Sequence, residues 1–91
     1  MARQDNAMQA YIQRAIETFM KRKGSVVYGD LANFRNDIDV KGVTLDQIAV
    51  ALRAMKQVDR LRLRKYRKGH PRAGWTRIRY VPPKRARLAV A

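Results

Sequence analysis

Two short segments near the end of the chain alternate apolar and basic residues, and this pattern constrains the fold more than any other feature. Residues 61–66 (LRLRKY) and 75–80 (WTRIRY) each show the period of two that is typical of a β-strand with one buried face. The eight residues between them, RKGHPRAG, are rich in turn formers. The sequence therefore predicts an antiparallel β-hairpin.

One strand register fits both alternations. It pairs Leu61 with Tyr80 and Leu63 with Ile78, so that these four apolar side chains share the face that we expect to contact the core. The opposite face, which we expect to meet solvent, then carries two facing pairs of arginines: Arg62 with Arg79, and Arg64 with Arg77. We expect Pro82-Pro83 to stop the second strand.

Apolar residues recur at helical spacing in the first part of the chain. A cap at Asp5-Asn6 and a stop at Gly24 bound the first predicted helix. Its expected inner stripe is Met8, Tyr11, Ile12, Ala15, Ile16 and Phe19. The β-branched run Ser25–Tyr28 that follows is predicted to be a short strand.

Two further helices are predicted before the hairpin. The shorter one buries Leu31, Phe34 and Ile38. Thr44, followed three residues later by Gln47, is a capping box that marks the start of the other, Thr44–Val58. The expected inner stripe of that helix is Leu45, Ile48, Ala49, Leu52 and Met55.

The charge of the chain is distributed unevenly. Lys and Arg number 21 against seven Asp and Glu, for a net charge of +14, and residues 53–91 contain a single acid, Asp59. Hydrophobic residues make up 46% of the chain, enough for a folded core. Each facing arginine pair costs up to ~1 kcal/mol. A folded domain that retains such pairs is expected to bind a polyanion.

This order of elements resembles the winged helix-turn-helix superfamily over about residues 6–81. The resemblance implies an α+β fold with three helices, a short first strand and a C-terminal β-hairpin wing. It also implies that the helix Thr44–Val58 enters the major groove of DNA and that the wing, Arg67–Gly74, contacts the backbone or the minor groove. We therefore expect residues 1–81 to form one winged-helix nucleic-acid-binding domain and residues 82–91 to form a basic, flexible tail.

One branch of the superfamily binds Z-DNA, and Trp75 after Pro71 resembles it. The Asn and Tyr that this branch carries on its recognition helix are absent from the outward face of the predicted third helix. The sequence therefore disfavours assignment to that branch.

The candidate DNA contacts fall into three groups. Glutamine forms hydrogen bonds with adenine, and small apolar side chains contact the thymine methyl, so the outward face of the third helix suits A·T pairs with low specificity. The candidates on this face are Gln47, Val50, Arg53, Ala54 and Gln57. An arginine on a narrow loop suits an A·T-rich minor groove; the wing candidates are Arg67, Lys68, His70 and, for insertion, Arg72. The candidate phosphate contacts are Arg62, Arg64, Arg77, Arg79, Lys84, Arg85 and Arg87.

These patterns predict a protein that binds double-stranded DNA, A·T-rich by preference, as a transcription regulator, a nucleoid or silencing protein, or a phage-encoded factor. Two alternatives stay open. One is an RNA-binding winged helix, ribosomal or RNA-processing, in which Tyr66 and Trp75 stack on unpaired bases, although we expect these two rings to pack across the hairpin instead. The other is a protein-interaction module on a transcription or replication complex, in which Val50 and Ala54 meet a partner. A homodimer is also left open.

Several other classes are not expected. Cysteine is absent, and the sequence has one serine and one histidine with no catalytic pattern around them, so we expect no enzyme activity, metal or cofactor. No apolar run is long enough for a signal peptide or a membrane span. We therefore expect an intracellular protein of the cytoplasm or nucleoid, or of the nucleus if the host is eukaryotic or the protein viral.

Overall fold

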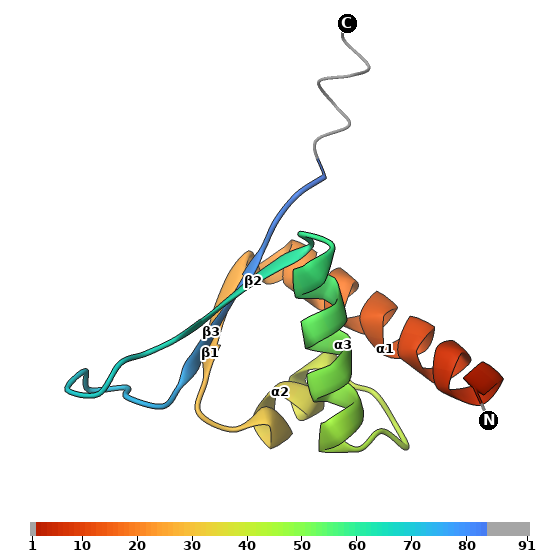
Figure 1. Ribbon diagram of the computed structural model, residues 1–91, viewed down its shortest axis with the longest axis horizontal. Coiled ribbons are helices and arrows are strands. Elements are labelled where there is room, and N and C mark those ends of the chain that lie inside the picture. Colours follow the sequence, from red (N-terminus) through yellow and green to blue (C-terminus); the bar gives the residue numbers. More distant parts are fainter. Residues whose placement is uncertain (1, 84–91) are drawn as a thin grey trace, which may run out of the picture.

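The computed structural model describes the backbone of residues 2–83 and the side chains of residues 6–83. Over this range the protein is a small α+β domain, with three helices on one side of a three-stranded antiparallel sheet (Figure 1). The elements in chain order are α1 (Ala2–Lys23), β1 (Ser25–Tyr28), α2 (Leu31–Ile38), α3 (Leu45–Gln57), β2 (Leu61–Lys65) and β3 (Thr76–Tyr80).

The predicted start of α1 is wrong, whereas its predicted stop is confirmed. The helix begins at Ala2 and runs through the expected cap at Asp5-Asn6. Alanine, arginine and glutamine before that cap are all good helix formers, so nothing in their backbone preference opposes an earlier start. At the other end Gly24 takes a positive φ of 77°, and its N–H donates to the carbonyl of Met20 over 2.7 Å.

Caps define the other two helices. Asp30 accepts a hydrogen bond from the N–H of Ala32 at the start of α2. The predicted capping box of α3 is confirmed, because the Thr44 hydroxyl accepts from the N–H of Gln47 while the Gln47 side chain accepts from the N–H of Thr44. Such a cap stabilises a helix by ~1 kcal/mol.

The hairpin has the predicted register, with Leu61 opposite Tyr80 and Leu63 opposite Ile78. The third strand, β1, lies on the other side of β3, giving the order β1-β3-β2. Leu61 and Ile78 are buried under the helices, and the four arginines on the opposite face are exposed, as predicted. The β3 strand ends at Tyr80, before Pro82-Pro83.

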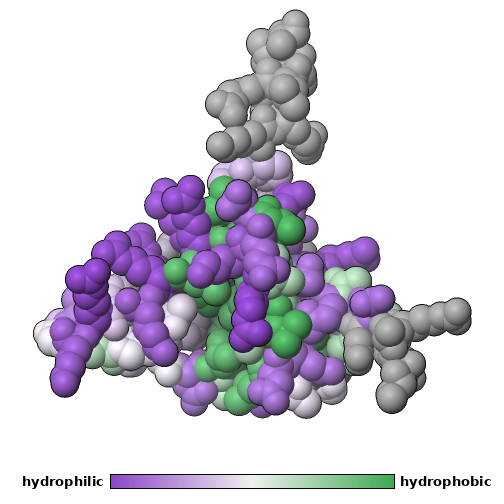
Figure 2. Space-filling view, viewed as in Figure 1, coloured by the Kyte–Doolittle hydropathy of each residue, from purple (hydrophilic) through white to green (hydrophobic). Residues whose placement is uncertain are grey.

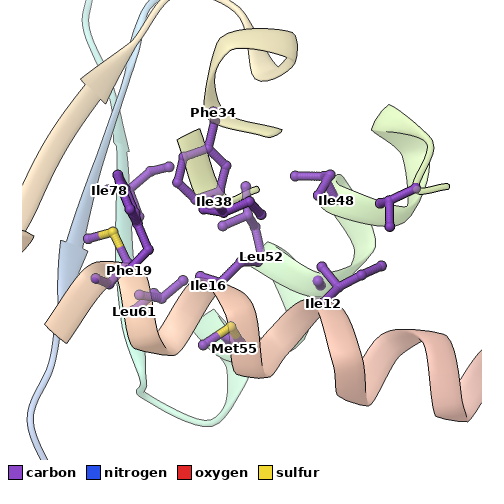
Figure 3. Close-up of a cluster of buried hydrophobic side chains, with 13 residues drawn as sticks. Ile12, Ile16, Phe19, Phe34, Ile38, Ile48, Leu52, Met55, Leu61 and Ile78 are labelled. Atoms are coloured by element: carbon purple, nitrogen blue, oxygen red, sulfur yellow. The ribbon is translucent and has the colours of Figure 1, made fainter. Parts of the chain in front are cut away.

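The core lies between the three helices and the inner face of the sheet (Figure 3). Most of the predicted apolar stripes are buried, but Tyr11 is 45% exposed and Leu45 37% exposed, so these two assignments are wrong. The Tyr11 hydroxyl lies at the edge of α1, where it accepts a hydrogen bond from the N–H of Lys41, and Leu45 is the first residue of α3. Three core residues were missed: Met20, Val43 and Ala51.

Candidate nucleic-acid interface

The exposed face of α3 mixes apolar, polar and charged side chains. Val50 is 46% exposed, and Arg53 and Gln57 are exposed beside it. Gln47 and Ala54, which were predicted to share this face, are only half-exposed. The Gln47 side-chain oxygen is used in the capping box, so the arrangement leaves Val50, Arg53 and Gln57 as the freely presented candidates on α3.

A hollow of about 440 Å³, here called the α3 groove, lies between α3, the hairpin and the segment that joins β1 to α2. Apolar side chains form part of its lining: Ala49, Leu52, Leu63 and Ile78. Three cations also line it, namely Arg53, Lys56 and Lys65. The only acid in the lining is Asp30, which is engaged as the cap of α2. The α3 groove is therefore a cationic cleft with an apolar floor.

Lys56 and Lys65 are functional candidates that the sequence predictions missed. Lys56 follows Arg53 by three residues on the flank of α3, and a helical projection that included the edges of the buried stripe would have found it. Lys65 continues the parity of Leu61 and Leu63, so its side chain is on the inner face of the sheet, beyond the end of the core. Helical projection and strand parity place both lysines from the sequence, but only the fold shows that they line the same groove.

The outer surface of the sheet carries four arginines and is called the arginine face: Arg62, Arg64, Arg77 and Arg79. All four side chains are exposed, and the register places them directly opposite one another in two pairs. Arg77 Nε donates to the Ser25 hydroxyl over 3.0 Å. Among the described residues one ion pair forms, between Arg60 and Glu17, and it lies on the helical side of the molecule. The arginine face is thus a cationic surface without acidic partners in the part of the chain that the structure describes.

The wing loop, residues 67–74, is held in a defined shape by its own hydrogen bonds. Consecutive turns form as His70 N–H donates to the Arg67 carbonyl and Ala73 N–H donates to the His70 carbonyl. The His70 Nδ1 atom accepts from the N–H of Arg72 over 3.0 Å. This bonding leaves the side chains of Arg67, Lys68 and Arg72 exposed on an ordered loop.

The expectation that Tyr66 and Trp75 pack on each other across the hairpin is wrong. Tyr66 stacks on His70, with ring centroids 4.5 Å apart, and Trp75 lies over Gly29 at the end of β1. The glycine has no side chain, so it leaves room for the indole on that side. The Arg72 guanidinium carbon lies 5.5 Å from the Trp75 ring centroid, so Arg72 is a cation–π partner of Trp75.

Hydrophilic side chains gather over the hairpin and the wing loop at the left of the view in Figure 2. Apolar side chains appear between the hydrophilic ones near α3. The predicted contacts Lys84, Arg85 and Arg87 lie outside the described residues. Within residues 6–83 no cluster of three or more His, Asp or Glu side chains is placed to hold a metal ion.

The chain has no match among protein-family models, among curated proteins or among solved structures. The functional inference therefore depends on the charge and geometry of the chain itself. In the described part of the chain, no helix combines the length and the apolar character that crossing a bilayer requires.

Proposed function

We propose that the protein is a winged-helix domain that binds double-stranded DNA without catalysis. The observation that carries the proposal is the convergence of Arg53, Lys56 and Lys65 on the α3 groove, beside the exposed face of α3. The order of the elements and the β1-β3-β2 sheet support the winged-helix assignment. A groove that places three cations between a helix and a hairpin suits a phosphate backbone that passes between them.

In this proposal α3 lies in or over the major groove. Arg53, Lys56 and Lys65 contact phosphates on one strand, and the wing loop reaches the adjacent minor groove. Val50 and Gln57 meet the base edges, where valine contacts the thymine methyl and glutamine bonds adenine. Arg53, the one arginine on this face, is assigned to a phosphate, so most of the affinity comes from phosphates and sequence discrimination is weak.

Duplex DNA is favoured over single-stranded RNA by the state of Tyr66. A base-stacking platform needs open ring faces, whereas His70 covers one face of Tyr66 and the Arg72 guanidinium lies over the ring of Trp75. The exposed Val50 is compatible with a protein partner. We propose that the domain acts as a transcription regulator, a nucleoid or silencing protein, or a phage-encoded factor.

Charge-removing variants test the proposal. Lys56→Gln and Lys65→Gln each remove one phosphate contact, so each is expected to weaken duplex binding about equally for all sequences and to make the salt slope shallower by about 1. The wild-type slope of log K against log salt is expected near −5 if about six phosphates are engaged.

Arg22→Gln is the matched control. Arg22 is exposed on α1 and lines a different hollow from the α3 groove, together with Asp37 and Asp39. Its removal is therefore expected to leave duplex affinity nearly unchanged. A wild-type slope flatter than about −2, or equal losses for Arg22→Gln and Lys56→Gln, would contradict the proposed site.

A further inference from the structure

The sheet separates two cationic surfaces that point in opposite directions. Successive residues of a strand place their side chains on opposite faces of a sheet. Lys65 therefore lies on the inner face and lines the α3 groove, whereas its neighbour Arg64 lies on the outer face with Arg77 opposite it. The three helices lie on the inner side of the sheet (Figure 1).

A straight duplex that occupies the α3 groove leaves the arginine face unoccupied. The duplex follows α3 and the wing loop, and the sheet stands between it and the outer arginines. In the described part of the chain no other element covers this face, and all four of its arginines are exposed. A duplex bound as proposed therefore does not neutralise the arginine face.

The arginine face is also shaped to meet an extended polyanion. Arg77 and Arg79 lie on β3, the central strand, with Arg62 and Arg64 opposite them on β2. On the other side, β1 presents the short side chains of Ser25 and Val27 opposite Arg79 and Arg77. The face is thus flanked on the β1 side by small groups, and each opposed pair carries a repulsion that bound phosphates would relieve.

We propose that one copy of the protein bridges two segments of double-stranded DNA. The α3 groove and the wing loop hold the first segment, and the arginine face binds phosphates of the second. This inference rests on the proposed function, because the first segment is the duplex assigned to the α3 groove. Phosphate contact through the arginine face carries no base readout, so the second segment is bound without regard to sequence.

A two-duplex capture assay tests the bridge. One A·T-rich duplex is immobilised, and capture of a second, labelled duplex is measured as protein is added; binding of a single free duplex is measured separately. The double variant Arg62→Gln/Arg79→Gln is expected to capture at least about tenfold less second duplex while its single-duplex affinity falls by no more than about threefold, since the groove cations remain.

Two controls separate this mechanism from others. Arg14→Gln/Arg22→Gln removes the same charge from exposed positions on α1 and is expected to bridge as well as wild type. Sedimentation at the bridging concentration is expected to give a monomer, since a dimer would bridge with two α3 grooves. Equal loss of capture in both double variants, or a dimer whose capture survives Arg62→Gln/Arg79→Gln, would overturn the inference.

The two proposals fail in different ways. If the wild-type protein binds a single duplex but never captures a second one, only the bridging inference fails. If it binds no duplex at all at low salt, the proposed function fails and the bridge with it.

Discussion

The indole of Trp75 lies so close to Gly29 that a Cβ atom on the glycine would be 2.6 Å from Trp75 Cε2 and 2.8 Å from Nε1. This contact joins the end of β1 to the start of β3, beside the wing loop. Trp75 in turn has the Arg72 guanidinium over its ring. The position of Arg72, the candidate for minor-groove insertion, thus depends on the absence of a side chain at position 29.

Gly29→Ala is expected to displace the indole and destabilise the domain. Overpacking costs about 1–3 kcal/mol in well-packed sites. Trp75 is 41% exposed and able to shift toward solvent, so a cost of about 1 kcal/mol is expected here. Trp75 is the only tryptophan, so its fluorescence reports the displacement directly, and urea unfolding reports the cost.

The Trp75→Ala background provides the control for that prediction. With the indole removed, Gly29→Ala is expected to be nearly neutral, because the contact that it violates is gone. The same cost in both backgrounds, with unchanged fluorescence in the first, would show that the contact does not constrain position 29.

Arg79→Glu is expected to stabilise the folded domain while it weakens bridging. Arg79 faces Arg62 across the hairpin, so the substitution replaces a like-charge pair with an opposite-charge pair. A gain of about 0.5–1 kcal/mol in the free energy of unfolding is expected at low salt, and less at high salt. Denaturant unfolding at two salt concentrations measures it.

The double variant Arg62→Glu/Arg79→Glu is the control for the pair. It restores a like-charge pair of the opposite sign, so the gain of the single variant is expected to disappear. A double variant that is more stable than either single variant would mean that general charge reduction, and not the cross-strand pair, sets the stability.

Tyr28 gives a prediction at high pH. Burial raises the pKa of the Tyr28 phenol, and the hydrogen bond that the phenol donates to Asp37, with the charge of that carboxylate, raises this pKa further. Because the folded pKa exceeds the unfolded value of about 10, the stabilising contribution is complete below that pH and is lost as pH rises toward the folded pKa. The stability advantage of wild type over Tyr28→Phe is therefore expected to shrink above about pH 10.

The comparison with Tyr28→Phe cancels the titration of the lysines and of the other tyrosines, which both proteins share. Unfolding free energies for the two proteins, measured across this range, check the prediction. An advantage that stays constant, or one that grows with pH, would contradict the proposed environment of Tyr28.

Arg72→Ala is expected to reduce the preference for A·T-rich duplexes more than Arg62→Ala does. Arg72 lies on the wing loop assigned to the minor groove, where A·T-rich DNA has its strongest negative potential, whereas Arg62 lies on the arginine face. Affinities of both variants for A·T-rich and G·C-rich duplexes measure the difference. Equal ratios for the two variants would remove the minor-groove role of Arg72.

Local signals in the sequence were sufficient for much of the fold. The capping box at Thr44 and Gln47 defines the start of α3 through bonds between residues three apart, so no distant contact is needed to predict it. The hairpin register follows from matching two alternations, because a slip by one residue would turn Leu61 and Ile78 to solvent.

The features that were missed depend on contacts between distant segments. Trp75 was predicted to pack on Tyr66 because the hairpin alone makes the two residues neighbours. In the fold, β1 brings Gly29, a residue far earlier in the chain, beside the indole instead. Lys56 and Lys65 become part of one groove only when α3 packs against β2. The four outer arginines were correctly predicted to share the solvent face of the hairpin, but the hairpin alone does not show that this face points away from α3.

A competition titration at one fixed salt concentration tests the central claim most directly. An A·T-rich duplex, a G·C-rich duplex and a single-stranded RNA of equal length compete for the protein. Binding through the α3 groove and the wing loop predicts the tightest binding to the A·T-rich duplex, slightly weaker binding to the G·C-rich duplex and the weakest to the RNA. Tightest binding to the RNA would contradict the groove assignment and make the arginine face, with Trp75, the primary binding surface.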